Sequence, residues 1–236
     1  MKPPDLEPFA LEPEAGQRIA GERLPGALPC YLFLHGLGSV RVGDKSAALF
    51  AHAAARGRAA VRYDQRGHGE SSGTIGVVTI SELIADAALV LDRTGPAIVF
   101  GSSLGGLVGA FLAAERPHDV RGLVLIAPAL GWVRRMRQRL DGAGQLRTSQ
   151  GLVFPVHPRV LADAERLDEA RLPERLPMPV LVVHGSDDDV VPSSLSRRFF
   201  AAIPHPRKDL WLVPGGDHRL NREISPILGR MDALLG

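Results

Sequence analysis

Residues 97–116 read AIVFGSSLGGLVGAFLAAER and contain the turn that decides the fold. An apolar run at 97–100 is typical of a buried strand, and the apolar stretch at 104–116 has helical length. Ser103 is the central residue of a Gly-x-Ser-x-Gly pattern between them, whereas Ser102 is off-centre. A serine on a sharp strand-to-helix turn holds its hydroxyl above the sheet, and flanking glycines avoid collisions with the strained backbone. The pattern predicts a nucleophilic Ser103; a glycine-rich turn with an incidental serine is the alternative.

Similar apolar runs recur along the chain and alternate with stretches of helical length. Most runs lack polar alternation, which is typical of strands that are covered on both faces. We therefore expect an α/β architecture, a mostly parallel central sheet with helices on both faces, with one or two weaker edge strands before residue 31. The expected strands are 31–34, 59–63, 97–100, 123–126, 180–183 and 210–213, and the expected helices are 45–56, 80–93, 104–116 and 194–203.

One connection, residues 128–179, is far longer than the others. Ordinary loops in such folds have about two to six residues beside one helix. The connection contains Trp132, the arginines 134, 135, 137 and 139, and a stretch at 161–176 that predicts a helix. We expect residues 1–236 to form a single catalytic domain in which 128–179 is a small inserted lid.

Composition argues against several other classes of protein. The chain has 236 residues with 28 Lys and Arg against 26 Asp and Glu, and a net charge of +2 does not favour nucleic-acid binding. A single cysteine, Cys30, leaves no disulfide framework within the chain and fits a reducing compartment. We find neither a signal-peptide pattern nor a window of about 18 apolar residues. We expect a cytoplasmic protein without stable membrane insertion, and the composition does not bear on oligomeric state.

Two later motifs contain the groups that a nucleophilic serine needs, a base and an acid that orients it. Residues 184–192, HGSDDDVVP, follow the strand 180–183, and residues 215–218, GGDH, follow the strand 210–213. With these motifs the chain resembles the α/β-hydrolase superfamily, in which nucleophile, acid and histidine follow in that order on successive strand ends. The resemblance implies that Asp188 is the acid of a catalytic triad and His218 its general base, with Asp187 and Asp189 as solvated neighbours.

The same resemblance implies an oxyanion hole. Residues 35–39, HGLGS, follow the strand 31–34, where the superfamily supplies one backbone donor. The expected donors are the backbone N–H groups of Leu37 and Leu104, and His35 is interpreted as a residue that holds this loop.

The segment 64–73, DQRGHGESSG, resembles a supporting turn of the superfamily, and we expect Asp64 and Arg66 to pair in it. A metal site built from His35, His68, His184 and Asp188 is an alternative, but these residues have no short ligand spacing. Serine hydrolysis of this kind needs no metal, so no metal and no cofactor are expected.

The strand-to-helix turn at Ser103, the segment that contains Asp188 and the segment that contains His218 are similar to those of abhydrolase-type acyl-protein thioesterases and acyl-glucuronide esterases. The turns at 35–38 and 66–69 are nearer to those of general carboxylesterases and monoacylglycerol lipases. The resemblance implies hydrolysis of a small-molecule carboxylic ester or thioester, with a small to medium acyl group, through an acyl-enzyme. Carbon-carbon bond hydrolysis, perhydrolysis and acyl transfer use the same triad and are alternatives, as is a non-catalytic ligand-binding member of the fold.

Three residues are candidates for substrate contact. Trp132 and Met136 would line the pocket or pack within the lid, and Arg219 adjoins the predicted base. The arginines of the lid are interpreted as a solvated helix face, with a clamp for an anionic substrate as the alternative.

Overall fold

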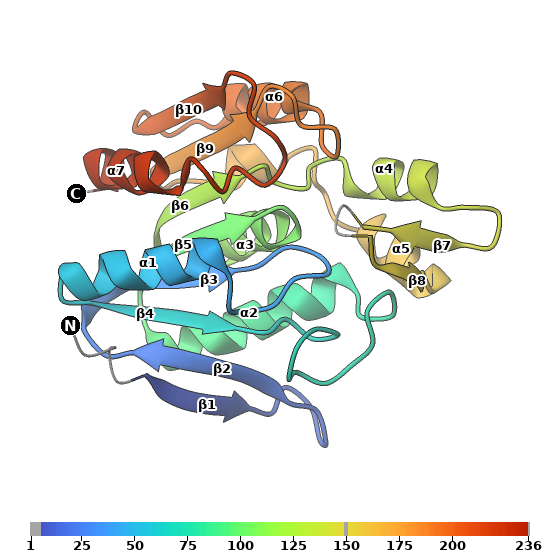
Figure 1. The fold of residues 1–236 in the computed structure, drawn as a ribbon, viewed down its shortest axis with the longest axis horizontal. Coiled ribbons are helices and arrows are strands. Elements are labelled where there is room, and N and C mark those ends of the chain that lie inside the picture. The colour runs from blue at the N-terminus through green and yellow to red at the C-terminus, as the bar shows by residue number, and fades with distance from the viewer. Residues whose placement is uncertain (1–5, 149–150, 236) are drawn as a thin grey trace.

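A mixed eight-stranded sheet is the centre of the computed structural model, which describes residues 6–148 and 151–235 (Figure 1). In spatial order the strands are β1 (Glu7–Leu11), β2 (Ile19–Leu24), β4 (Arg58–Tyr63), β3 (Ala27–Leu34), β5 (Ala97–Ser102), β6 (Val120–Ile126), β9 (Val180–Gly185) and β10 (Lys208–Val213). The last six strands in this order run parallel to one another, whereas β2 is antiparallel to both of its neighbours. The sheet therefore has the mostly parallel order that the sequence predicts.

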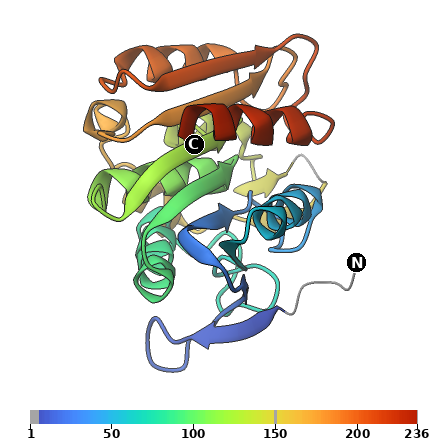
Figure 2. The same cartoon turned by 90° about the vertical axis from the view of Figure 1, so that its left-hand side faces the viewer.

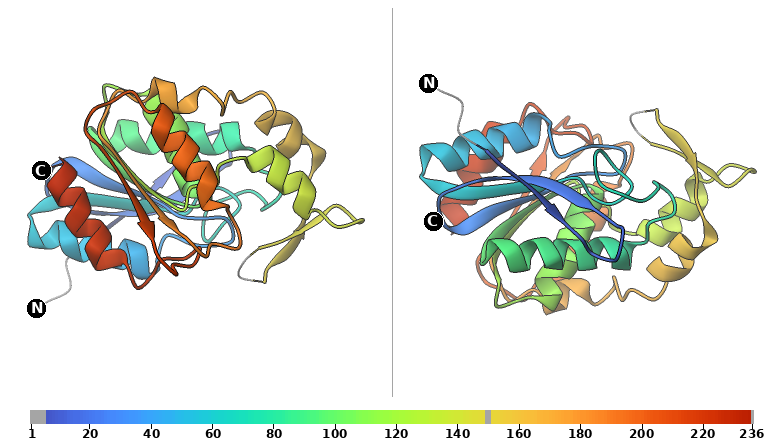
Figure 3. Two further views of the ribbon diagram at one scale, coloured as in Figure 1. Left: turned by 90° about the horizontal axis from the view of Figure 1, so that it is seen from above. Right: turned by 90° about the horizontal axis from the view of Figure 1, so that it is seen from below.

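Helices cover both faces of this sheet (Figures 2 and 3). One layer contains α1 (Asp44–Ala55) and α7 (Ile224–Leu235), which contact each other. The other layer contains α2 (Ile80–Thr94), α3 (Leu104–Glu115) and α6 (Ser193–Ala202). The sequence analysis expected all of these helices except α7.

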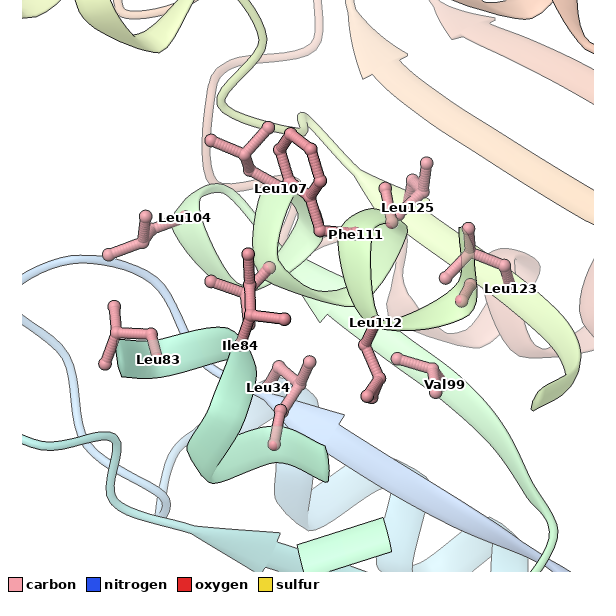
Figure 4. Close-up of a cluster of buried hydrophobic side chains, with 14 of the residues drawn as sticks. Leu34, Leu83, Ile84, Val99, Leu104, Leu107, Phe111, Leu112, Leu123 and Leu125 are labelled. Atoms are coloured by element: carbon pink, nitrogen blue, oxygen red, sulfur yellow. The ribbon is translucent and has the colours of Figure 1, made fainter. Parts of the chain in front are cut away.

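Alternating side chains of the strands divide the core into two clusters. On β3, Tyr31 and Phe33 belong to the cluster under α1 and α7, whereas Leu32 and Leu34 belong to the cluster under α2 and α3. Figure 4 shows Leu34 among apolar side chains of β5, β6, α2 and α3. Because both faces are buried, these strands are apolar at successive positions.

The described part of the connection 128–179 contains α4 (Trp132–Arg139), β7 (Gln145–Arg147), β8 (Val153–Pro155), α5 (Pro158–Ala164) and a 3-10 helix at Leu172–Arg175. The elements α4, β7, β8 and α5 lie beyond the carboxyl ends of the parallel strands, at one end of the molecule (Figures 1 and 3). The 3-10 helix instead contacts α3 and α6. The single helix expected at 161–176 is wrong: α5 ends at Ala164, and a separate 3-10 helix begins at Leu172, followed by Pro173, which has no backbone N–H.

No helix in the described part of the chain is long and apolar enough to cross a membrane.

Candidate active site

The turn between β5 and α3 holds Ser103 in an unusual backbone conformation. Ser103 has φ 53° and ψ −116°, and its N–H donates to the Ile126 carbonyl at 2.9 Å. The nearby glycines are required by close packing: a Cβ on Gly101 would lie 2.4 Å from the Gly105 carbonyl oxygen, and one on Gly105 would lie 2.1 Å from the Leu34 carbonyl oxygen. The turn is therefore fixed by contacts in which only glycine fits.

His218 lies between Ser103 and Asp188. Its Nε2 is 3.0 Å from Ser103 Oγ, and its Nδ1 is 2.7 Å from Asp188 Oδ2. The three side chains come from the turns that follow β10, β5 and β9, which end at the same edge of the sheet. In this geometry His218 can accept the proton of the Ser103 hydroxyl while Asp188 stabilises the resulting imidazolium.

Asp188 is buried and fully hydrogen-bonded. Its Oδ1 accepts the N–H groups of Val190 and Val191, both at 2.8 Å, and its Oδ2 also lies 3.0 Å from His184 Nε2. Burial raises the pKa of Asp188, but the hydrogen bonds from His184 and His218 and the N–H of Val191 outweigh it, so the pKa lies well below its ordinary value. Asp188 therefore stays ionised over the working pH range.

The turns after β9 and β10 are packed against each other. A Cβ on Gly185 would lie 2.1 Å from the Gly216 carbonyl oxygen, so only glycine allows this approach. Asp217 Oδ1 accepts the N–H of Leu220 at 2.8 Å and thereby closes the turn that carries His218. These contacts fix His218 relative to the neighbouring turn.

Two backbone donors adjoin Ser103. Leu37 lines the same pocket as Ser103 and His218, and Leu104 begins α3 directly after Ser103. Within residues 6–148 and 151–235, neither of their N–H groups has an intramolecular acceptor. Together with the positive end of the α3 dipole, such donors can stabilise an oxyanion.

A pair of buried histidines holds the loop that carries Leu37. Gln65 N–H donates to His35 Nε2 and Gly38 N–H donates to His68 Nε2, both at 3.0 Å, and the rings meet edge to face with centroids 5.1 Å apart. Burial, with a further contribution from His68, lowers the pKa of His35 to about 4, and burial lowers the pKa of His68 as well. Both rings are therefore neutral at pH 7 and act as acceptors for this loop.

Asp64 and Arg66 do not form the predicted pair. Asp64 accepts the backbone N–H of Arg41 at 2.6 Å and forms an ion pair with the Arg41 side chain. Arg66 Nε instead lies 2.7 Å from Asp86 Oδ2 on α2. The prediction is wrong because each side chain finds its partner on another element, which a local motif cannot reveal.

Two cavities that share Leu37, Trp132 and Met136 in their linings adjoin each other at the Ser103 turn, and we treat them as two lobes. We call the first the arginine lobe: it is lined by Ser103, His218, Arg135, Arg139 and Arg147, among other residues. The second, the apolar lobe, is lined mainly by Leu104 and apolar side chains of residues 75–83 and 154–160; its polar members are His68 and Arg66, which is paired with Asp86. A carbonyl group at Ser103 would thus lie beside two chemically different spaces.

The candidate substrate contacts lie in different places. Trp132 and Met136 are buried and line both lobes. Arg219 is exposed and does not line either lobe; it borders a separate cavity with Lys45 and Asn221.

Sequence reasoning missed the positions of the arginines. Arg135 and Arg139 were interpreted as part of a solvated face; Arg139 is exposed as expected, whereas Arg135 is partly buried. Both line the pocket, as does Arg147, which was not a candidate. The only available signal was the density of arginine in the connection.

The sheet order, the strained serine turn and the Ser103–His218–Asp188 hydrogen bonds define an α/β hydrolase. The chain belongs to the family described as "Serine aminopeptidase, S33", whose model matches residues 29–168 and 159–225.

Relatives of known name support this placement. The chain is 29% identical over 215 residues to the palmitoyl-protein thioesterase ABHD10 of Bos taurus, covering 85% of this chain and 70% of that protein. The solved structure of mouse α/β hydrolase domain-containing protein 10 superposes with a TM-score of 0.86 at 28% identity, covering 97% and 98% of the two chains. Est1E from Butyrivibrio proteoclasticus, at 20% identity and a TM-score of 0.83 over 96% and 98% of the chains, shares the fold.

Proposed function

We propose that this chain is a serine hydrolase that cleaves carboxylic esters and thioesters of small to medium acyl groups through an acyl-enzyme. The observation that carries the proposal is the continuous hydrogen-bonded series from Ser103 Oγ through His218 to Asp188 Oδ2, at 3.0 and 2.7 Å. At the level of class the chain is a hydrolase acting on ester bonds, and its relatives named palmitoyl-protein thioesterases support thioesters as substrates.

In the first step Ser103 Oγ attacks the carbonyl carbon while His218 Nε2 accepts the hydroxyl proton. The negative charge on the carbonyl oxygen is held by the N–H groups of Leu37 and Leu104. The bond from the carbonyl carbon to the leaving oxygen or sulfur then breaks, and His218 returns its proton to the leaving atom.

In the second step a water molecule replaces the leaving group beside His218. His218 takes a proton from the water, the hydroxide attacks the acyl-enzyme, and the Ser103 oxygen leaves with the proton from His218. Asp188 remains ionised throughout and stabilises the imidazolium.

Residues 128–179 serve as a lid in this proposal. Trp132 and Met136 of α4 line the space above Ser103, and this supports a role of the segment in binding substrate and in excluding water.

The proposal is tested with p-nitrophenyl butyrate and the variant Ser103→Ala. We expect turnover to fall by at least about 10³-fold while the far-ultraviolet circular dichroism stays unchanged. Retained turnover in a folded Ser103→Ala variant would sink the proposal.

A second measurement separates hydrolysis from acyl transfer. A panel of esters of increasing chain length is offered with added alcohols, thiols or hydrogen peroxide as competing nucleophiles. We expect free acid as the main product; a preference for an added nucleophile would favour the transferase or perhydrolase alternative.

A further inference from the structure

The arginine lobe concentrates positive charge in side chains that form no ion pair within the described residues. Arg135 donates to the carbonyl oxygens of Leu130 and Val190, at 2.8 and 2.6 Å, and Arg139 donates to that of Arg147 at 3.0 Å. Among the described residues, these three arginines make hydrogen bonds to backbone carbonyls and no ion pair with a carboxylate. Arg137, on the same helix but outside the pocket, is paired with Glu165.

This arrangement is costly without a ligand. Burial of Arg135 lowers its pKa, and the positive charge of Arg139 lowers it further, outweighing the opposite effect of the Glu169 and Asp188 carboxylates. Arg135 is partly buried, whereas Arg139 and Arg147 are exposed, so only Arg135 loses much hydration. The repulsion among guanidinium groups that line one pocket is a further cost, which an anion in the pocket would offset. The neighbouring indole Nε1 of Trp132 is also buried, with no hydrogen-bond partner in the described chain.

The position of His218 identifies which part of the substrate meets these arginines. His218 Nε2 must reach the leaving atom to protonate it, and His218 lines the arginine lobe but not the apolar lobe. Leu104, a proposed oxyanion donor, lines the apolar lobe, and Leu37 lines both. The leaving group therefore lies in the arginine lobe and the acyl chain in the apolar lobe, with the carbonyl group at their junction.

We propose that the substrates of this chain are esters or thioesters whose leaving group carries a carboxylate or a phosphate, bound by Arg135, Arg139 and Arg147. The inference rests on the proposed function, because it uses Ser103 and His218 to orient the substrate. It adds the charge of the leaving group and its place in the pocket.

The test compares S-butyryl thioesters that differ only in the charge of the leaving thiol. The thiols are 3-mercaptopropionate, 3-mercaptopropionamide and thiocholine, and thiol release is measured as kcat/KM. We expect the anionic thioester to be preferred over the neutral one by about tenfold, as for one charge-assisted hydrogen bond, and the cationic one to be the poorest. Equal values for the three would overturn the inference.

A further pair distinguishes the two sources of negative charge. Butyryl-coenzyme A and butyryl-pantetheine share the thioester end, but only the former carries phosphates. A preference for butyryl-coenzyme A assigns the arginines to phosphate, whereas a preference confined to the mercaptopropionate thioester assigns them to a carboxylate near the leaving atom.

Variants assign the selectivity to named residues. We expect Arg135→Gln, and the double change Arg139→Gln with Arg147→Gln, to reduce the anionic-to-neutral ratio toward one, and Arg135→Lys to retain part of it. Arg137→Gln is the matched control, because it removes a paired arginine of the same helix, and its ratio should equal that of the wild type. The ratio isolates charge selectivity from any general loss of activity; a ratio that all the pocket variants retain would contradict the inference.

Binding to Ser103→Ala separates this inference from the proposed function. Isothermal titration with 3-(butylthio)propionate and 3-(butylthio)propionamide needs no turnover. We expect tighter binding of the carboxylate, dependent on Arg135. If the wild type hydrolysed no ester or thioester, the proposed function would fail, whereas equal binding of the two thioethers would contradict the leaving-group assignment.

Discussion

His184 Nε2 lies 3.0 Å from Asp188 Oδ2, the same carboxylate oxygen that faces His218. The Nδ1 of His184 lies 2.7 Å from the hydroxyl of Ser196 on α6, and both side chains are buried. With its proton on Nε2, His184 donates to the Val191 carbonyl oxygen at 2.9 Å and has the Asp188 oxygen as a second neighbour, while its Nδ1 accepts the Ser196 hydroxyl proton. The acid of the proposed triad is therefore tied to α6 through a second histidine.

The variant His184→Gln should show what this contact does. His184 donates one of the hydrogen bonds that lower the pKa of Asp188, so its removal raises that pKa. We expect kcat to fall by about tenfold, as for the loss of one hydrogen bond to a charged group. Steady-state kinetics of the folded variant measure this; an unchanged kcat would show that His184 only fills space.

The strained backbone of Ser103 is expected to lower the stability of the protein at the position that the proposed activity requires. Glycine adopts φ 53° without strain, whereas an alanine at this position retains the strain of the serine. We expect Ser103→Gly to have a free energy of unfolding about 1 kcal/mol higher than Ser103→Ala, with both variants inactive. Urea denaturation of the two proteins checks this, and equal values would mean that the turn is not strained.

The buried neutral His35 predicts a loss of stability in acid. Its folded-state pKa of about 4 lies below the ordinary 6.5, so its contribution is present above pH 6.5 and is lost as the pH falls toward 4, because only the unfolded state takes up the proton. We expect the free energy of unfolding of the wild type to fall by up to about 3 kcal/mol relative to His35→Gln over this range.

The comparison is made as a difference because burial raises the pKa of Asp86 to about 6, which has the opposite effect in both proteins. Urea unfolding of the wild type and His35→Gln at a series of pH values gives this difference. A difference that does not change with pH would contradict the assignment of a neutral, buried His35.

Glu169 fixes the start of α4. Its carboxylate accepts the N–H groups of Gly131 and Trp132, and burial raises its pKa. We expect Glu169→Ala to cost about 1 kcal/mol, to lower hydrogen-exchange protection at residues 131–136 and to raise KM, because Trp132 lines both lobes. Glu165→Ala, which removes an exposed ion pair of the same helix, is the control and should change little.

The sheet and most helices could be predicted from the sequence because strands buried on both faces are apolar at successive positions. The nearness of Ser103, Asp188 and His218 follows from the same logic, since parallel strands end at one edge of the sheet; their catalytic roles stay predictions. The helix α7 was not expected, and the strands β7 and β8 have only three residues each, too few to show a pattern.

Side-chain partners outside local motifs could not be predicted. Arg66 pairs with Asp86 rather than with Asp64, and Arg135 bonds to the carbonyl of Val190 across the pocket. These contacts depend on how distant segments pack, which neither spacing nor periodicity contains. The same limit applies to Arg219, whose neighbour His218 lines the pocket while Arg219 does not.

Labelling with a fluorophosphonate, followed by mass spectrometry of the modified peptide, tests the central claim most directly. The account predicts one phosphonylated residue, Ser103, and much slower labelling of His218→Ala, because the serine then lacks its base. Labelling at Ser102, labelling that is independent of His218, or no labelling of the folded protein would contradict it.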